Sequence, residues 1–208
     1  MDDNNLQGFI PPQLENLSAI DQLELPNNRL TGNIPPELGK LKTLIILSLG
    51  NNQLSGNIPS QIGDLETLWL LSLKQNQLSG DIPPHLGNLK NLCGLHLQYN
   101  QLSGDLPGEI GNMSGLEYLN LEHNLFTGSI PPQLKNIKGL RYLYLDNNQL
   151  TGNIPAEMGD MSNLYQCYLD HNQLSGSIPW QLGNAGKTGV LGVLFLYLNN
   201  NRLSGEIP

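Results

Sequence analysis

The sequence predicts a repeat solenoid in which each repeat adds one short parallel strand to a concave sheet. Three observations support this prediction: a fixed period, an alternating leucine pattern, and frequent glycine and proline. An asparagine recurs every 24 residues, at Asn4, Asn28, Asn52, Asn76, Asn100, Asn124, Asn148 and Asn172. Self-similarity at a period of this length is typical of repeat proteins, in which each repeat packs on its neighbours.

The segment before each asparagine alternates as a strand with one buried face does. Leu47 and Leu49 point inward, whereas Ser48 and Gly50 point to solvent. The same alternation predicts eight strands. They are expected around Leu23–Leu25, Leu47–Leu49, Leu71–Leu73, Leu95–Leu97, Leu119–Leu121, Leu143–Leu145, Cys167–Leu169 and Leu196–Leu198.

The recurring asparagine follows the strand where the chain turns inward. Backbone groups in such an interior turn are out of reach of water, so they need partners within the protein. An asparagine amide offers both a donor and an acceptor for this purpose. We therefore expect the asparagines to form a hydrogen-bonded ladder along the stack.

The second half of each repeat carries the core around the far side. Leu54, Ile58 and Ile62 continue the apolar pattern, Gly56 permits a backbone conformation closed to other residues, and Pro59 fixes φ. The chain contains 23 glycines and 14 prolines, which argues against long α-helices. Short 3-10 turns and irregular segments are expected on the convex side.

Each repeat reads L-x-x-L-x-L-x-x-N-x-L-x-G-x-I-P-x-x-L-G-x-L, and the part N-x-L-x-G-x-I/L-P occurs nine times between Asn4 and Pro208. This pattern resembles the plant-type leucine-rich repeat of receptor-like kinase and receptor-like protein ectodomains and of polygalacturonase-inhibiting proteins. The resemblance covers essentially all 208 residues. It implies an α/β-class leucine-rich-repeat solenoid, a curved right-handed stack with a parallel concave sheet of about eight strands and a convex side of mostly 3-10 turns and loops.

We expect residues 1–208 to form a single leucine-rich-repeat domain. Both ends interrupt a repeat, which favours a fragment of a longer chain over a naturally short protein. The spacing changes once, because five extra residues lie between Leu182 and Val193. The segment 183–189 is similar to a phosphate-binding loop, but Gln181 stands where that motif needs glycine. We therefore interpret the insertion as a convex-side loop.

Charge and cysteine usage exclude several classes of protein. A formal charge of −8 disfavours binding to nucleic acid or to anionic membranes. No apolar run approaches the roughly 20 residues of a membrane span, so no transmembrane segment is expected. Cys93 and Cys167 lie three repeats apart, and at about 4.8 Å per strand that separation exceeds disulfide reach. Both cysteines are therefore expected to be free, with Cys167 at an inward position.

The resemblance implies an extracellular location or the ectodomain of a plasma-membrane protein. A cytoplasmic location stays open, because no signal peptide precedes the first repeat and the cysteines are unpaired. Two Asn-x-Ser sequons, at Asn16 and Asn112, fall at the same convex position of their repeats. We expect both asparagines to be exposed glycosylation sites.

Outward strand positions vary between repeats while the framework stays nearly constant, which is typical of a binding scaffold. Toward the C-terminus, these positions gather tyrosines and acids, with Phe195, His123 and His171 alongside. The predicted ligand-binding residues are Tyr118, Glu122, Tyr142, Tyr144, Asp146, Tyr168, Asp170 and Tyr197. Tyrosines are favoured in binding surfaces, although cross-strand aromatics also pack on one another without any ligand.

A smaller apolar patch, Ile45, Ile46, Trp69 and Leu70, is expected near the N-terminal rim, as a partner contact or as rim packing. His123 and His171 are two repeats apart, roughly 10 Å, so they do not form an acid–base pair or a metal site. We expect no catalytic residue, metal or cofactor.

The sequence therefore predicts a non-enzymatic recognition module that binds a peptide or protein on its concave face, as in a plant-type receptor ectodomain. The alternatives are an inhibitor of a secreted cell-wall hydrolase and a ligand-free structural repeat scaffold. The strand-side positions hold two bases, Lys74 and Arg141, against six acids, so a basic ligand is favoured. These acids are Asp21, Glu24, Glu117, Glu122, Asp146 and Asp170.

Overall fold

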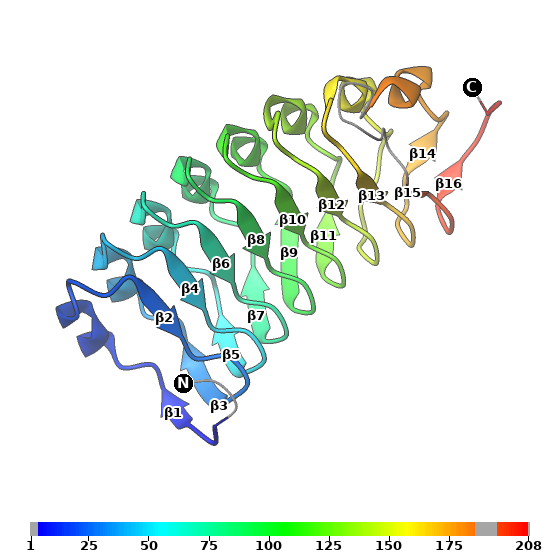
Figure 1. The fold of residues 1–208 in the computed structure, drawn as a ribbon. Helices are drawn as coiled ribbons and strands as arrows, with labels where there is room; N and C mark the ends of the chain where they lie inside the picture. The colour runs from blue at the N-terminus through cyan, green and yellow to red at the C-terminus, as the bar shows by residue number, and fades with distance from the viewer. Residues whose placement is uncertain (1–3, 186–194, 208) are drawn as a thin grey trace.

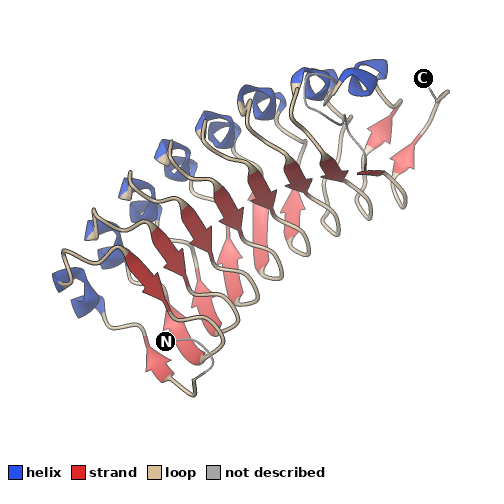
Figure 2. Ribbon diagram, viewed as in Figure 1, coloured by secondary structure: helices blue, strands red, loops and turns tan. Residues whose placement is uncertain are grey.

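A computed structural model describes residues 4–185 and 195–207 of the chain. The chain winds into successive coils that stack side by side in a gently curved array (Figure 1). Each complete coil contributes a strand to the concave sheet, a turn, a second extended segment and a 3-10 helix. The helices line one edge of the stack, and the loops that follow the concave strands line the other (Figure 2). The predicted solenoid is confirmed.

Within residues 4–185 and 195–207, eight parallel strands form the concave sheet, in the order β15-β13-β12-β10-β8-β6-β4-β2. Equivalent residues of neighbouring repeats pair directly, so that Leu119 pairs with both Leu95 and Leu143. All eight predicted strands are present, each shifted by one residue toward the N-terminus. They are β2 (Gln22–Glu24), β4 (Ile46–Ser48), β6 (Leu70–Ser72), β8 (Gly94–His96), β10 (Tyr118–Asn120), β12 (Tyr142–Tyr144), β13 (Gln166–Tyr168) and β15 (Phe195–Tyr197).

A second parallel sheet, which the sequence analysis did not predict, follows the turn. Six strands make it, and two further strands pair near the C-terminus. The six are β1 (Gln7–Phe9), β3 (Arg29–Asn33), β5 (Gln53–Gly56), β7 (Gln77–Gly80), β9 (Gln101–Asp105) and β11 (Leu125–Thr127), and the pair is β14 (Ser175–Gly176) with β16 (Arg202–Leu203). These segments are rich in glycine and short polar residues, whose strand propensity is low. They become strands because stacking places equivalent extended backbones side by side.

In the part of the chain that the structure describes, eight 3-10 helices form the convex edge, and a proline directly precedes each of them. They are η1 (Pro12–Asn16), η2 (Pro36–Lys40), η3 (Ser60–Asp64), η4 (Pro84–Asn88), η5 (Gly108–Asn112), η6 (Pro132–Asn136), η7 (Ala156–Asp160) and η8 (Trp180–Asn184). Neighbouring helices approach closely, since a Cβ added at Gly39 would lie 2.3 Å from the carbonyl oxygen of Gln61. The predicted short convex turns are confirmed.

The asparagine ladder is present as predicted. The Asn124 amide nitrogen donates to the carbonyl oxygens of Leu121 at 3.1 Å and Leu97 at 3.0 Å, and its Oδ1 accepts from the backbone N–H of Leu102 at 3.1 Å. Each ladder asparagine from Asn28 to Asn201 thus fastens its own turn to the preceding repeat.

The residue just before each of these asparagines has a left-handed backbone, with φ between 51° and 58°. These residues are Asn27, Asn51, Gln75, Tyr99, His123, Asn147, His171 and Asn200. Asparagine and histidine tolerate this region better than most residues, and six of the eight are Asn or His. The left-handed turn was not predicted from the sequence.

The leucines and isoleucines of the repeat form one continuous buried core along the stack. Leu47 and Leu49 are fully buried, as the alternation predicted. Cys167 occupies an inward position and is buried, Cys93 is half-buried, and both thiols are free. The cysteine predictions are therefore confirmed.

Three other expectations concern the surface. The insertion between Leu182 and Val193 falls largely on residues 186–194, which lie outside the described residues. Asn16 and Asn112 are exposed as the last residues of η1 and η5, and their glycosylation stays a prediction. Among the described residues, no helix has the length and apolar character needed to cross a membrane.

Candidate concave binding surface

The strands toward the C-terminus place all five predicted tyrosines on one continuous part of the concave face. Tyr144 pairs in register with Tyr168, which pairs with Tyr197, and Tyr118 pairs with Tyr142. These side chains point outward because the residues between them on each strand enter the core. Their role in binding stays a prediction, but the structure brings them together.

The tyrosine rings pack on one another in a branched row. Tyr118 contacts Tyr142 and Tyr144, with ring centroids 5.1 and 5.3 Å apart. Tyr144 contacts Tyr168 at 4.8 Å, and Tyr168 contacts Tyr197 at 4.5 Å. The packing expected of cross-strand aromatics is therefore real, and it leaves Tyr197 44% exposed. Rings that are already ordered lose little conformational entropy when a ligand covers them.

Two further aromatic residues extend this row, and the sequence analysis did not include them among the site residues. His96 stacks on Tyr118 with centroids 4.8 Å apart. Tyr165 makes edge contacts with Tyr142 at 5.9 Å and with Phe195 at 5.8 Å. Tyr165 directly precedes β13, so it lies one position outside the outward strand positions from which the site residues were chosen. The available signal was its place three residues before Tyr168 in the sequence.

The three predicted acids lie beside the tyrosines in consecutive repeats. Backbone hydrogen bonds link the repeats that carry these acids. The N–H of His123 donates to the carbonyl of Asp146 at 3.1 Å, and the N–H of Asn147 donates to the carbonyl of Asp170 at 3.1 Å. Glu122 completes the row in the preceding repeat. We call Glu122, Asp146 and Asp170 the acid column.

Asp146 and Asp170 each have a partner in the residue that follows. The Asn147 amide donates to Asp146 Oδ2 at 2.8 Å, while Asp146 Oδ1 is buried without a hydrogen-bond partner. His171 Nδ1 lies 2.7 Å from Asp170 Oδ2. Both of these following residues have a left-handed backbone, with φ of 53° at Asn147 and 51° at His171. One buried oxygen in the column is thus left unsatisfied.

The electrostatics of the acid column oppose ionisation. Burial, and then the charge of Asp146, raise the pKa of Glu122. Burial also raises the pKa of Asp146, with a further contribution from the charge of Asp170. Both effects disfavour a second negative charge in a partly dehydrated place. A cation bound over the column would relieve them.

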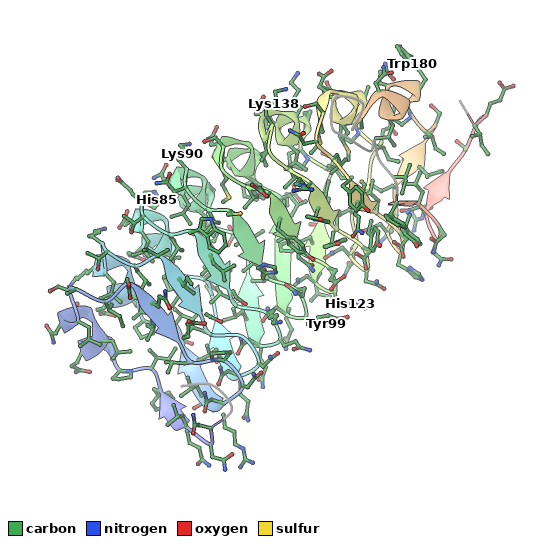
Figure 3. All side chains as sticks on the ribbon, viewed as in Figure 1. His85, Lys90, Tyr99, His123, Lys138 and Trp180 are labelled. Carbon is green, nitrogen blue, oxygen red and sulfur yellow. The ribbon has the colours of Figure 1, made fainter. Side chains whose placement is uncertain are left out.

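His123 and His171 lie two repeats apart and make different contacts. The His123 ring stacks on Tyr99 with centroids 4.4 Å apart, and both lie on the loop edge of the stack (Figure 3). His171 instead contacts Asp170 and the Asn200 amide, which lies 2.7 Å from its Nε2. Within the described ranges, no group of three or more histidine, cysteine or acidic side chains could hold a metal ion.

The N-terminal apolar patch is also assembled. Trp69 is 51% exposed and Ile45 is 42% exposed, and the backbone N–H of Trp69 donates to the carbonyl of Ile45 at 2.8 Å. Ile46 and Leu70 are half-buried next to them, at the start of β4 and β6. Only β8 separates β6, which holds Leu70, from β10, which holds Tyr118 of the tyrosine row.

A family model for the Leucine Rich Repeat matches seven consecutive segments of this chain. The segments are 20–41, 43–65, 67–89, 91–113, 115–137, 139–161 and 163–185. The chain belongs to the leucine-rich repeat family. Its repeats are of the plant type, as the resemblance implied, because solved plant leucine-rich repeat ectodomains have the same structure. No curated protein is significantly similar to the chain in sequence.

Three solved structures show the range of similar proteins. The plant peptide hormone receptor RGFR1 in complex with RGF2 is 38% identical with a TM-score of 0.93, over 98% of this chain and 32% of the receptor chain. The Arabidopsis receptor kinase HAESA, in complex with the peptide hormone IDA and the co-receptor SERK1, is 31% identical with a TM-score of 0.72, over 97% and 37%. A plant ice-binding protein is 31% identical with a TM-score of 0.77, over 100% and 73%. This leucine-rich repeat chain spans about a third of the receptor chains.

Proposed function

We propose that this leucine-rich repeat protein is a non-enzymatic recognition module that binds a peptide or protein segment with cationic groups on its concave face. The observation that carries this proposal is the continuous row of ordered, partly exposed tyrosines beside the acid column. One scaffold serves many functions in such folds, so the site rather than the fold decides between them.

The aromatic row supplies the apolar part of the proposed contact. Tyrosine offers large contact area and a hydroxyl group, and its ring face attracts Arg and Lys side chains. The acid column supplies the charged part, because burial and the neighbouring carboxylates disfavour the charges of Glu122 and Asp146, and a guanidinium or ammonium group would relieve both effects. A ligand with both basic and apolar side chains therefore fits this face better than an acidic or purely polar one.

The solved relatives support a peptide as the ligand. RGFR1 and HAESA were solved in complexes with peptide hormones, and this chain is similar to about a third of each. By the same resemblance we propose an extracellular location for this module. An enzyme-inhibiting role would use the same acidic face against a basic protein surface, and the binding experiment separates the two.

The test is a selection of random displayed peptides on the immobilised protein, repeated at low and at high salt. We expect enriched peptides to contain Arg or Lys next to apolar residues, and their binding to weaken as salt screens the charges. The double variant Asp146→Asn with Asp170→Asn should weaken them by about tenfold or more, as for charge-assisted contacts. Tyr168→Ala should weaken them as well.

The matched control is Asp81→Asn with Asp160→Asn, which removes the same charge from exposed positions away from the concave sheet. Binding that is indifferent to salt, or equally weakened by both double variants, would contradict the acid column as the site. Enrichment of no peptide, combined with tight binding of a basic hydrolase, would favour the inhibitor role.

A further inference from the structure

An open hollow lies on the N-terminal half of the concave face, away from the acid column. Its walls include Ser48, Leu70, Ser72, Lys74 and His96, from strands β4, β6 and β8 and the turn after β6. No acidic residue lines it. The hollow is therefore a place on the concave face where the local charge has the opposite sign to the acid column.

Lys74 packs over Gly50 of the neighbouring repeat, which has no side chain. A Cβ added at Gly50 would lie 3.0 Å from Lys74 Cγ and 3.4 Å from Ser72 Oγ. The aliphatic stem of Lys74 therefore covers the buried Gly50, as long basic side chains do on apolar surface. Among residues 4–185 and 195–207, the ion pairs within 4.0 Å do not include Lys74.

The remaining polar groups of the hollow are uncharged. Burial and the nearby charge of Lys74 lower the pKa of His96 to about 4, so this imidazole is neutral at physiological pH. Ser48 and Ser72 contribute hydroxyl groups, which can donate hydrogen bonds. One positive charge with neutral donors around it is the chemistry that binds an oxyanion.

The hollow and the tyrosine row belong to one surface. His96 lines the hollow on one side and stacks on Tyr118 on the other. Lys74 and Asp146 occupy equivalent positions three 24-residue repeats apart, which at about 4.8 Å per strand is roughly 14 Å. An extended peptide covers this distance in about four residues.

We propose that the hollow around Lys74 binds a carboxylate of the ligand, so that a peptide lies along the concave face with its anionic group over the N-terminal repeats and its cationic group over the acid column. This inference rests on the proposed function and adds a direction and a spacing to it. The favoured ligand has a carboxylate, from its C-terminus or from an Asp or Glu side chain, about four residues from an Arg or Lys.

The experiment uses the peptides enriched on the wild-type protein, each resynthesised in three forms. One has its free C-terminus, one has a C-terminal amide, and one has its Asp and Glu residues replaced by Asn and Gln. We expect at least one of the last two forms to lose about tenfold in affinity for the wild-type protein. The form that loses affinity identifies the source of the carboxylate.

Lys74→Gln tests the hollow directly. This variant should bind the free-carboxylate peptide about as weakly as the wild type binds the neutralised form, and neutralising the peptide should then have no further effect. Lys74→Arg should retain most of the affinity. Lys138→Gln is the matched control, because Lys138 is exposed on the convex edge (Figure 3).

The outcomes separate this inference from the proposed function. If peptides bind through the acid column but are indifferent to the loss of their carboxylates and to Lys74→Gln, the inference is overturned and the proposed function stands. A preference for phosphate or sulfate groups over carboxylates would overturn the assignment of the anion. If no peptide binds, the proposed function fails and the inference fails with it.

Discussion

Asn124→Leu is expected to destabilise the protein by leaving one buried backbone group unpaired. In the native structure Asn124 is 6% exposed, and its Oδ1 accepts from the N–H of Leu102. Its amide nitrogen donates to the carbonyl of Leu97, which also accepts from Asn100, and to that of Leu121, which also accepts from Asn148. The two carbonyls therefore keep a partner in the variant, whereas the N–H of Leu102 loses its side-chain acceptor.

Because both carbonyls keep a second donor, the loss of stability comes from the N–H of Leu102. One unpaired buried N–H costs about 1–3 kcal/mol, and in a chain of this size each kcal/mol lowers the unfolding midpoint by roughly 2–4 °C. The assay is thermal and urea unfolding, together with hydrogen exchange of the Leu102 amide, which should lose protection. Asn136→Leu is the control, because Asn136 is exposed at the end of η6, and it should change stability by less than about 0.5 kcal/mol. Equal stability of the two variants, or unchanged protection at Leu102, would refute the ladder as the stabilising element.

Three further predictions concern single sites. Gly56→Ala should lower the free energy of unfolding in urea by about 1–3 kcal/mol, because φ is 75° and the new Cβ would lie 2.5 Å from an amide oxygen of the preceding repeat. Gly183→Ala is the control and should be nearly neutral, because a Cβ at Gly183 would have no described atom within 4 Å. Cys167→Ser should lower the free energy of unfolding by about 1–3 kcal/mol, because it buries a hydroxyl group at a leucine position, whereas Cys93→Ser should be tolerated. In the native protein, only Cys93 should react with a thiol reagent. Burial, and then a neighbouring carboxylate, raise the folded-state pKa of Asp146 above its ordinary value of 3.8. Between 3.8 and this raised pKa the folded state binds more protons than the unfolded state, so the free energy of unfolding falls as the pH rises through this range. Asp146→Asn should therefore raise the thermal midpoint at neutral pH and lose this advantage below about pH 4; an equal gain at both pH values would contradict the assignment.

Much of the candidate site followed from the repeat alone. Once the ladder asparagine is identified, counting back four or six residues gives outward positions, and the structure brings Tyr118, Tyr142, Tyr144, Tyr168 and Tyr197 into one row. Adjacency followed because a constant period places equivalent residues of successive repeats next to each other. Tyr165 was missed because it lies seven residues before Asn172, outside those positions, yet its ring contacts Tyr142 and Phe195.

The amino-acid sequence by itself determined the solenoid, the eight concave strands, the asparagine ladder, the convex 3-10 turns and the free cysteines. These features depend on the spacing of residues within one repeat, and the same spacing recurs in each repeat. Only the tertiary structure decided the second sheet, the left-handed residue before each ladder asparagine and the lowered pKa of His96. It also decided that Lys74 lies over Gly50 and that one oxygen of Asp146 is buried without a partner. These features arise between repeats, where the packing of unlike side chains across neighbouring strands sets geometry and burial, and no pattern within a single repeat contains that information.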